Sequence, residues 1–351
     1  MTAPAAPVNS LFRPVDFLLL GGLSVLAWLA PLPLYLLALA CFGLPHVLWE
    51  IRWLYRNPAL FSRPGAFRPR YLPRYWWGLL AALLAVQAGG RLLLWLGGIR
   101  GMDALSLDLL TLALILLLTL LLPVHLTQGW PRARKGLMYA LALTGSGLLG
   151  LALLADVPHY AIALVVVLSV AHNFTPVGLI RMNPQADAAS RRSIDRLFLL
   201  PFGLLLLPVI NETGLWGGEG TWGPTEWHWL REETRLGAWS GVLPALVLAQ
   251  CLHYYAVLRL LPRSLGPHWQ AGSLPDRRNW QAGLILAACA GLTLYFAVQF
   301  ADARRLYAVA SGIHAWLEWP LLLCLLGGLL HPAAASAVSP AASPLSPEVE
   351  N

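Results

Sequence analysis

Long apolar runs recur along almost the whole chain, and they constrain its fold more than any other feature of the sequence. A helix needs about 20 apolar residues to cross a bilayer, because each residue adds about 1.5 Å to its length. We predict ten such spans, at 15–31, 33–54, 76–97, 104–126, 136–155, 159–181, 196–210, 239–261, 280–300 and 306–329. The span at 196–210 is short and contains Pro201 and Pro208, so it is predicted to be re-entrant or strongly distorted.

The scarcity of charge supports an all-α, polytopic membrane bundle. Charged residues make up 12% of the 351 residues and hydrophobic residues 58%, whereas soluble domains carry about 25% charged residues. The net charge of +7 would suggest nucleic acid as a partner of a soluble protein. In a membrane protein the location of the charged residues matters more than their sum. The expected partners are therefore membrane lipids and no nucleic acid.

The distribution of basic residues predicts the orientation. With ten spans, 18 of the 24 lysines and arginines fall on one side of the membrane and six on the other. Because basic loops stay in the cytoplasm, both termini are predicted to be cytoplasmic. We expect a multi-pass protein of a bacterial inner membrane.

Two segments stand apart from the predicted spans, although residues 1–331 are expected to form a single transmembrane domain. Residues 211–238 are acidic and rich in tryptophan, so they are expected to lie on the outer leaflet, either as an inert interfacial loop or as a lid. Residues 332–351 are rich in Ala, Ser and Pro and are predicted to be disordered.

Ionisable residues inside the spans are the main functional signal, because each is costly at the centre of a membrane. His46, His172 and His253 lie eight or nine residues from the cytoplasmic ends of three parallel spans, so they share one depth. His314 lies in the last span, nearer the midplane. His125 is closer to the cytoplasmic surface and is not expected to have a role.

Two histidines are paired with carboxylates. His46 and Glu50 are four residues apart, as are His314 and Glu318, and this spacing places both members of a pair on one helix face. A single buried histidine is often only hydrogen-bonded to a neighbour. The joint arrangement instead predicts a metal site, and its ligands would be His46, His172, His253, His314, Glu50 and Glu318.

Neighbouring residues complete the predicted site. Asn173 and Tyr254 directly follow two of the histidines and are expected to orient them. Pro45 and Pro176 predict broken helices, which are tolerated where they line a cavity. Glu50, Glu318 and Tyr254 are the predicted catalytic side chains.

Several imidazoles with carboxylates suit non-haem iron(II) better than zinc or copper, and iron with open positions binds dioxygen. The HExxH motif of zinc peptidases is absent, as are the HxxxH and HxxHH boxes of membrane desaturases and hydroxylases. The leading hypothesis is an iron-dependent membrane oxygenase that takes dioxygen and a lipid-soluble substrate.

The segment FGLPHVLWE, which contains His46, resembles the GLPH-type motif of the bacterial membrane carotene dioxygenases of the Brp/Blh type. The motif of that family continues with Gly-Ala and then Asp, whereas this chain has Val47, Leu48, Trp49 and Glu50. The resemblance implies a polytopic protein that uses non-haem iron to cleave a carotenoid. It also implies that the iron ligands are the four histidines of the AHNFTP, CLHYYAVLR, GIHAWLEW and GLPH segments, namely His172, His253, His314 and His46.

Other functions remain open from the residues alone. The histidines could bind haem in an electron-transfer protein, or they could carry protons or metal ions through a transporter. The chain could also be an accessory subunit of a membrane complex. The sequence does not identify the substrate, the electron donor or the number of metal ions.

Overall fold

The computed structural model describes residues 12–56, 74–97, 104–118, 132–154, 170–182, 188–206, 242–264 and 280–330. These residues are helical apart from short turns, and they include no strand, which confirms the predicted all-α class for them. The helices are α1 (Pro14–Leu29), α2 (Pro31–Arg56), α3 (Arg74–Trp95), α4 (Ala104–Leu118), α5 (Arg132–Leu154), α7 (Thr175–Met182), α8 (Ala188–Leu197), α9 (Leu200–Leu204), α11 (Val242–Tyr255), the π-helical η6 (Ala256–Leu260), α12 (Leu261–Ser264), α14 (Trp280–Val298) and α15 (Phe300–Leu330).

Four stretches of helix in the described residues are long and apolar enough to cross a membrane. They are Pro33–Glu50 in α2, Arg74–Trp95 in α3, Lys135–Leu154 in α5, and Leu243–Arg263 across α11, η6 and α12. Large apolar side chains are exposed on the outer helices, including Leu18, Leu154 and Leu286. A surface of this kind is stable in lipid and unfavourable in water, so the chain is a membrane protein.

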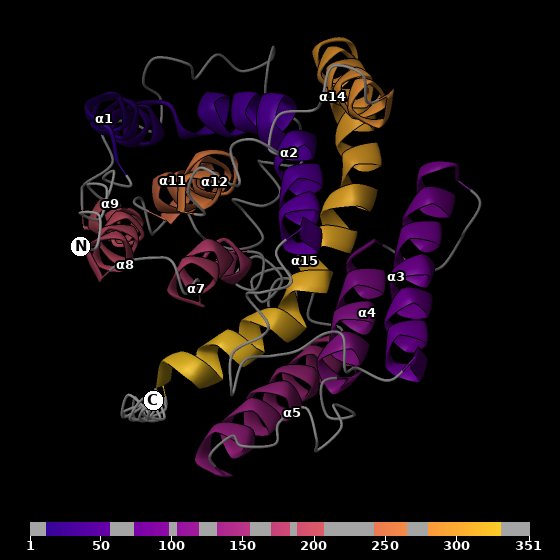
Figure 1. The fold of residues 1–351 in the computed structure, drawn as a ribbon. Helices are drawn as coiled ribbons and strands as arrows, with labels where there is room; N and C mark the ends of the chain where they lie inside the picture. Colours follow the sequence, from indigo (N-terminus) through magenta and orange to yellow (C-terminus); the bar gives the residue numbers. More distant parts are fainter. Residues whose placement is uncertain are drawn as a thin grey trace, which may run out of the picture.

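Most of the helices form two groups that share α15, and α14 packs against α2 and α15 (Figure 1). We call α1, α2, α7, α8, α9, α11, η6 and α12 the α11 group, because α11 contacts α1, α2 and α9 and lies between them. We call α3, α4 and α5 the α4 group, because α4 packs against both of its neighbours. Helix α15 contacts α3, α4 and α5 on one side and α2 and α7 on the other.

Two interruptions of regular helix lie close to the predicted site. Helix α2 changes direction about halfway along its length (Figure 1), where Pro45 removes a backbone donor and crowds the preceding turn. The segment around His172 is not one continuous helix. It turns at Asn173 and Phe174 before α7 begins at Thr175.

A third irregularity follows α11 directly. The chain widens into the π-helical η6 and then continues as α12, whose second residue is Pro262. Proline crowds the carbonyl four residues before it, here that of Leu258, and a wider turn relieves this crowding.

Several predicted features lie outside the described residues. They are the tryptophan-rich segment 211–238, the tail 332–351, both chain termini and His125. In the described part of the span predicted at 196–210, the end of α8 is followed by the five-residue α9. The ten-span arrangement therefore stays a prediction.

Candidate metal centre

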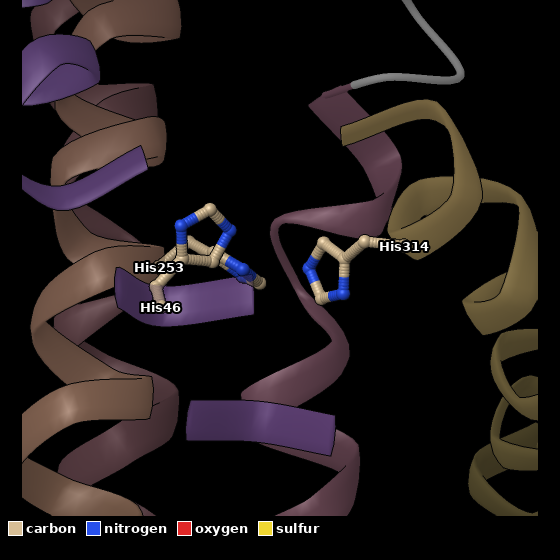
Figure 2. A group of neighbouring side chains, drawn as sticks. All are labelled: His46, His253 and His314. Atoms are coloured by element: carbon tan, nitrogen blue, oxygen red, sulfur yellow. The ribbon is translucent and has the colours of Figure 1, made fainter. Parts of the chain in front are cut away.

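Four histidines from different parts of the chain converge near α2, α7, α11 and α15. They are His46 on α2, His172 on the helical turn before α7, His253 on α11 and His314 on α15, and all are buried. The ring centroid of His46 lies 5.1 Å from that of His253 and 5.0 Å from that of His314. Figure 2 shows these three rings facing a common space from three helices.

The nitrogen atoms are close enough to share one ion. One ligand atom from each of His46, His253 and His314 lies within 4.8 Å of the others. A second group consists of His172, His314 and Glu318, and one ligand atom from each of these residues also lies within 4.8 Å of the others. The two groups overlap at His314, so they are parts of one cluster.

Both predicted carboxylates join this cluster. Glu50 Oε2 lies 3.7 Å from His253 Nε2 and 3.7 Å from His314 Nε2. Glu318 Oε1 lies 3.5 Å from the same nitrogen of His314. Glu50 is 0% exposed and Glu318 is 3% exposed, so neither carboxylate is solvated.

Backbone carbonyls set the orientation of two imidazoles. His46 Nδ1 lies 3.0 Å from the carbonyl oxygen of Phe42, and His253 Nδ1 lies 3.3 Å from that of Asn173. A carbonyl oxygen only accepts, so each Nδ1 carries the proton and donates it. The Nε2 atom of each ring is then left with a lone pair, as a metal ligand requires.

The turn at Asn173 and Phe174 explains the second of these bonds. Because the chain leaves regular helix there, the Asn173 carbonyl is free to accept from a side chain of another helix. Asn173 was predicted to orient a ligand, and the atom that contacts His253 is its backbone oxygen. The side-chain Oδ1 of Asn173 is buried and has no hydrogen bond in the described structure.

Thr175 belongs to the cluster, although the sequence analysis did not single it out. Its hydroxyl lies 3.1 Å from Glu318 Oε2 and 2.8 Å from the carbonyl oxygen of His172. Both oxygens accept, so the hydroxyl proton is shared between them. The signal available in the sequence was a buried hydroxyl three residues after a candidate ligand, in HNFTP.

Tyr254 contacts the cluster from α11. Its ring centroid lies 4.2 Å from that of His46, with an angle of 37° between the planes. This buried ring packs against the His46 imidazole and limits its rotation. Tyr254 therefore lies beside the cluster, and its catalytic role stays a prediction.

Several polar atoms of the cluster have no hydrogen-bond partner among the described residues. They include both carboxylate oxygens of Glu50, Oε1 of Glu318, and Nε2 of His253 and of His314. Burying a polar atom without a partner costs about 1–3 kcal/mol, and more for a charged group. A cation within the cluster would offer a partner to several of these atoms.

The donor set narrows the choice of ion. It consists of imidazole nitrogens and carboxylate oxygens, and neither three-residue group includes a cysteine. Such donors suit iron(II), manganese(II) and zinc(II), whereas copper(I) and iron–sulfur clusters prefer sulfur ligands. The residues present therefore fit a non-haem iron ion.

Comparisons of the chain with models of known protein families, with curated proteins and with solved structures gave no match. The resemblance of the His46 segment to the Brp/Blh-type dioxygenases thus stays a prediction.

Proposed function

We propose that this chain is an integral-membrane, non-haem iron oxygenase that acts on a lipophilic substrate. One observation carries the proposal. Five nitrogen and oxygen atoms of buried His and Glu side chains lack hydrogen bonds in the described structure, and they lie where α2, α11 and α15 meet inside a membrane protein. An ion with both nitrogen and oxygen ligands fits this arrangement.

The protein residues have distinct tasks in this proposal. His46, His253 and His314 hold the ion through their Nε2 atoms, and His172 contributes together with His314 and Glu318. Glu50 and Glu318 offset the charge of a divalent cation in a region without solvent. Iron(II) with open coordination positions supplies the binding and activation of dioxygen.

The surroundings of the cluster support a lipid-soluble substrate. Its helices belong to a bundle whose outer surface is apolar, so a substrate dissolved in the bilayer can approach between helices without crossing water. Oxidative cleavage of a carotenoid is our specific candidate reaction, on the basis of the sequence resemblance.

We also propose the full ten-span topology, with both termini in the cytoplasm of a bacterium and the chain in its inner membrane. The distribution of basic residues supports it. Reporter fusions after residues 100 and 265 test it, because the first is predicted to be outside and the second inside.

Elemental analysis of the detergent-purified chain tests the proposed function, together with an absorption spectrum of the same sample. We expect about one iron per chain, consistent with a single cluster of this size, and no Soret band. Oxygen consumption with carotenes in mixed micelles follows as the activity assay. A stoichiometric haem, or no metal after expression in iron-supplemented medium, would refute the proposal.

A transporter is the second candidate, because the helix break at Asn173 and Phe174 lies beside buried His and Glu residues. Broken helices line ion pathways in many transporters. Metal uptake into proteoliposomes that is lost in Glu318→Gln would favour this alternative. Uptake equal to that of empty liposomes would exclude it.

A further inference from the structure

Arginines from four separate segments gather at one end of the α11 group. Asp16 of α1 binds Arg259 of η6, with 3.0 Å between Oδ1 and Nε, and it also binds Arg263 of α12. Helix α12 contacts α7, and α7 contacts α8. These contacting segments together carry seven arginines, which we call the arginine face: Arg13, Arg181, Arg191, Arg192, Arg196, Arg259 and Arg263.

The arginine face carries a large excess of positive charge. Within α1, α7, α8, η6 and α12 the only carboxylates are Asp16 and Asp195. Asp16 is 1% exposed and binds Arg259 and Arg263, whereas Asp195 binds Arg181. Both carboxylates are therefore already engaged.

Helix α8 carries two arginines that bind neither Asp16 nor Asp195. Arg192 and Arg196 are four residues apart on its exposed face, whereas Ile194 and Leu197 are buried in the α11 group. No carboxylate among the described residues pairs with Arg192 or Arg196. Their guanidinium groups are available to an external anion.

Exposed apolar surface begins within a few residues of these arginines. Leu199 is 62% exposed and Phe202 is 52% exposed, directly after α8. In the same way Phe17 and Leu18 are exposed a few residues after Arg13. This change from cationic to apolar surface matches the change from headgroup to hydrocarbon in a lipid leaflet.

We propose that the arginine face binds the headgroups of anionic phospholipids, with the exposed side chains around α9 and at the start of α1 in contact with their acyl chains. A guanidinium group binds phosphate oxygens in a bidentate manner. A soluble acidic protein would match the charge but would leave the adjacent leucines and phenylalanines exposed. A lipid covers both surfaces, and this inference is independent of the reaction at the metal cluster.

The first test uses the full-length chain in nanodiscs that contain phosphatidylglycerol and phosphatidylcholine. The protein is removed gently from the disc, and mass spectrometry of the lipids that stay bound to it gives the ratio of phosphatidylglycerol to phosphatidylcholine. We expect phosphatidylglycerol to be enriched over the bulk mixture, and to lose its enrichment in 0.5 M NaCl, because salt screens exposed charges. Equal retention of the two lipids by the wild-type chain would overturn the proposal, without any variant being needed.

The second test locates the site. Arg192→Gln with Arg196→Gln is compared with the control Arg132→Gln with Arg305→Gln, which removes the same charge from exposed positions on α5 and α15. Loss of each bound arginine is expected to weaken phosphatidylglycerol retention about fivefold. The control double variant should retain as much phosphatidylglycerol as the wild type does. An equal loss of phosphatidylglycerol in both double variants would refute a site on α8. Arg192→Lys with Arg196→Lys keeps the charge and should keep most of the retention.

Discussion

Buried polar side chains have different hydrogen-bond partners in the α4 group and in the His/Glu cluster of the α11 group and α15. In the α4 group, three of these side chains bond to backbone carbonyls: Thr111 donates to Leu107 at 2.7 Å, Ser146 to Ala113 at 2.9 Å and the Trp76 indole to Leu118 at 3.1 Å. In the cluster formed by the α11 group and α15, Glu50, His253 and His314 have polar atoms with no such partner in the described structure.

The difference shows how a functional polar site is distinguished from an ordinary one inside a membrane. Hydroxyl and indole groups need one acceptor, and a carbonyl oxygen of the same helix or of a neighbouring helix can supply it. Carboxylates and imidazole lone pairs are acceptors themselves, so a backbone rich in carbonyls cannot satisfy them. Such atoms need a donor or a cation, which is why their convergence points to an ion.

Removing a central imidazole should have the largest effect. In His253→Ala we expect the metal affinity to fall more than about 100-fold, the upper limit observed for residues that only support a ligand. Metal content after equilibrium dialysis measures this. Content equal to that of the wild type would show that His253 is not a ligand.

Glu50→Gln preserves the shape of the side chain but removes its charge. Because Glu50 Oε2 lies 3.7 Å from two of the imidazole nitrogens, we expect about 100-fold weaker metal binding, or about 2.7 kcal/mol. Competition with a chelator gives the affinity. Gln87→Leu, at a buried polar position on α3, is the matched control and should bind metal normally.

Thr175→Val tests a residue that contacts Glu318 and the His172 carbonyl but is not itself a candidate ligand. Loss of the hydroxyl at 3.1 Å from Glu318 Oε2 should weaken metal binding about tenfold. Thr175→Ser should restore it, because serine keeps the hydroxyl. If valine and serine behave alike, the hydroxyl has no part in holding the carboxylate.

Ser146→Ala should have the smallest effect, and on a different property. It removes one bond between α5 and α4, so we expect the free energy of unfolding to fall by about 0.6 kcal/mol with no change in metal affinity. Thermal unfolding in detergent, with and without metal, measures both. A change in metal affinity would mean that the two helix groups are less independent than their hydrogen bonds indicate.

The sequence predicts the helical class and the cluster well for one physical reason. Charged side chains inside a membrane are so unfavourable that those present stand out, as His46, Glu50, His314 and Glu318 do. Their spacing of four residues then fixes which helix face each pair shares. The structure brings these residues together with His172 and His253, and whether they hold iron stays a prediction.

Other details depend on contacts that the sequence does not encode locally. The bond from Thr175 to Glu318 joins residues 143 positions apart. The acceptor for His253 is a backbone atom of Asn173, whereas the sequence had suggested the Asn173 side chain. The wider π-helical turn after α11 also escaped prediction. A proline such as Pro262 can be accommodated by a kink, a break or a wider turn, and tertiary packing decides among them.

The positions of the ligands along the chain have a consequence for biogenesis. His46 lies on the second helix and Glu318 on α15, the last helix that the structure describes. A nascent chain that still lacks α15 offers neither His314 nor Glu318, so the cluster can form only after residues 1–318 have been synthesised and α15 has packed against α2. A metal ion bound at the cluster would therefore distinguish chains in which α15 has joined the bundle from chains in which it has not.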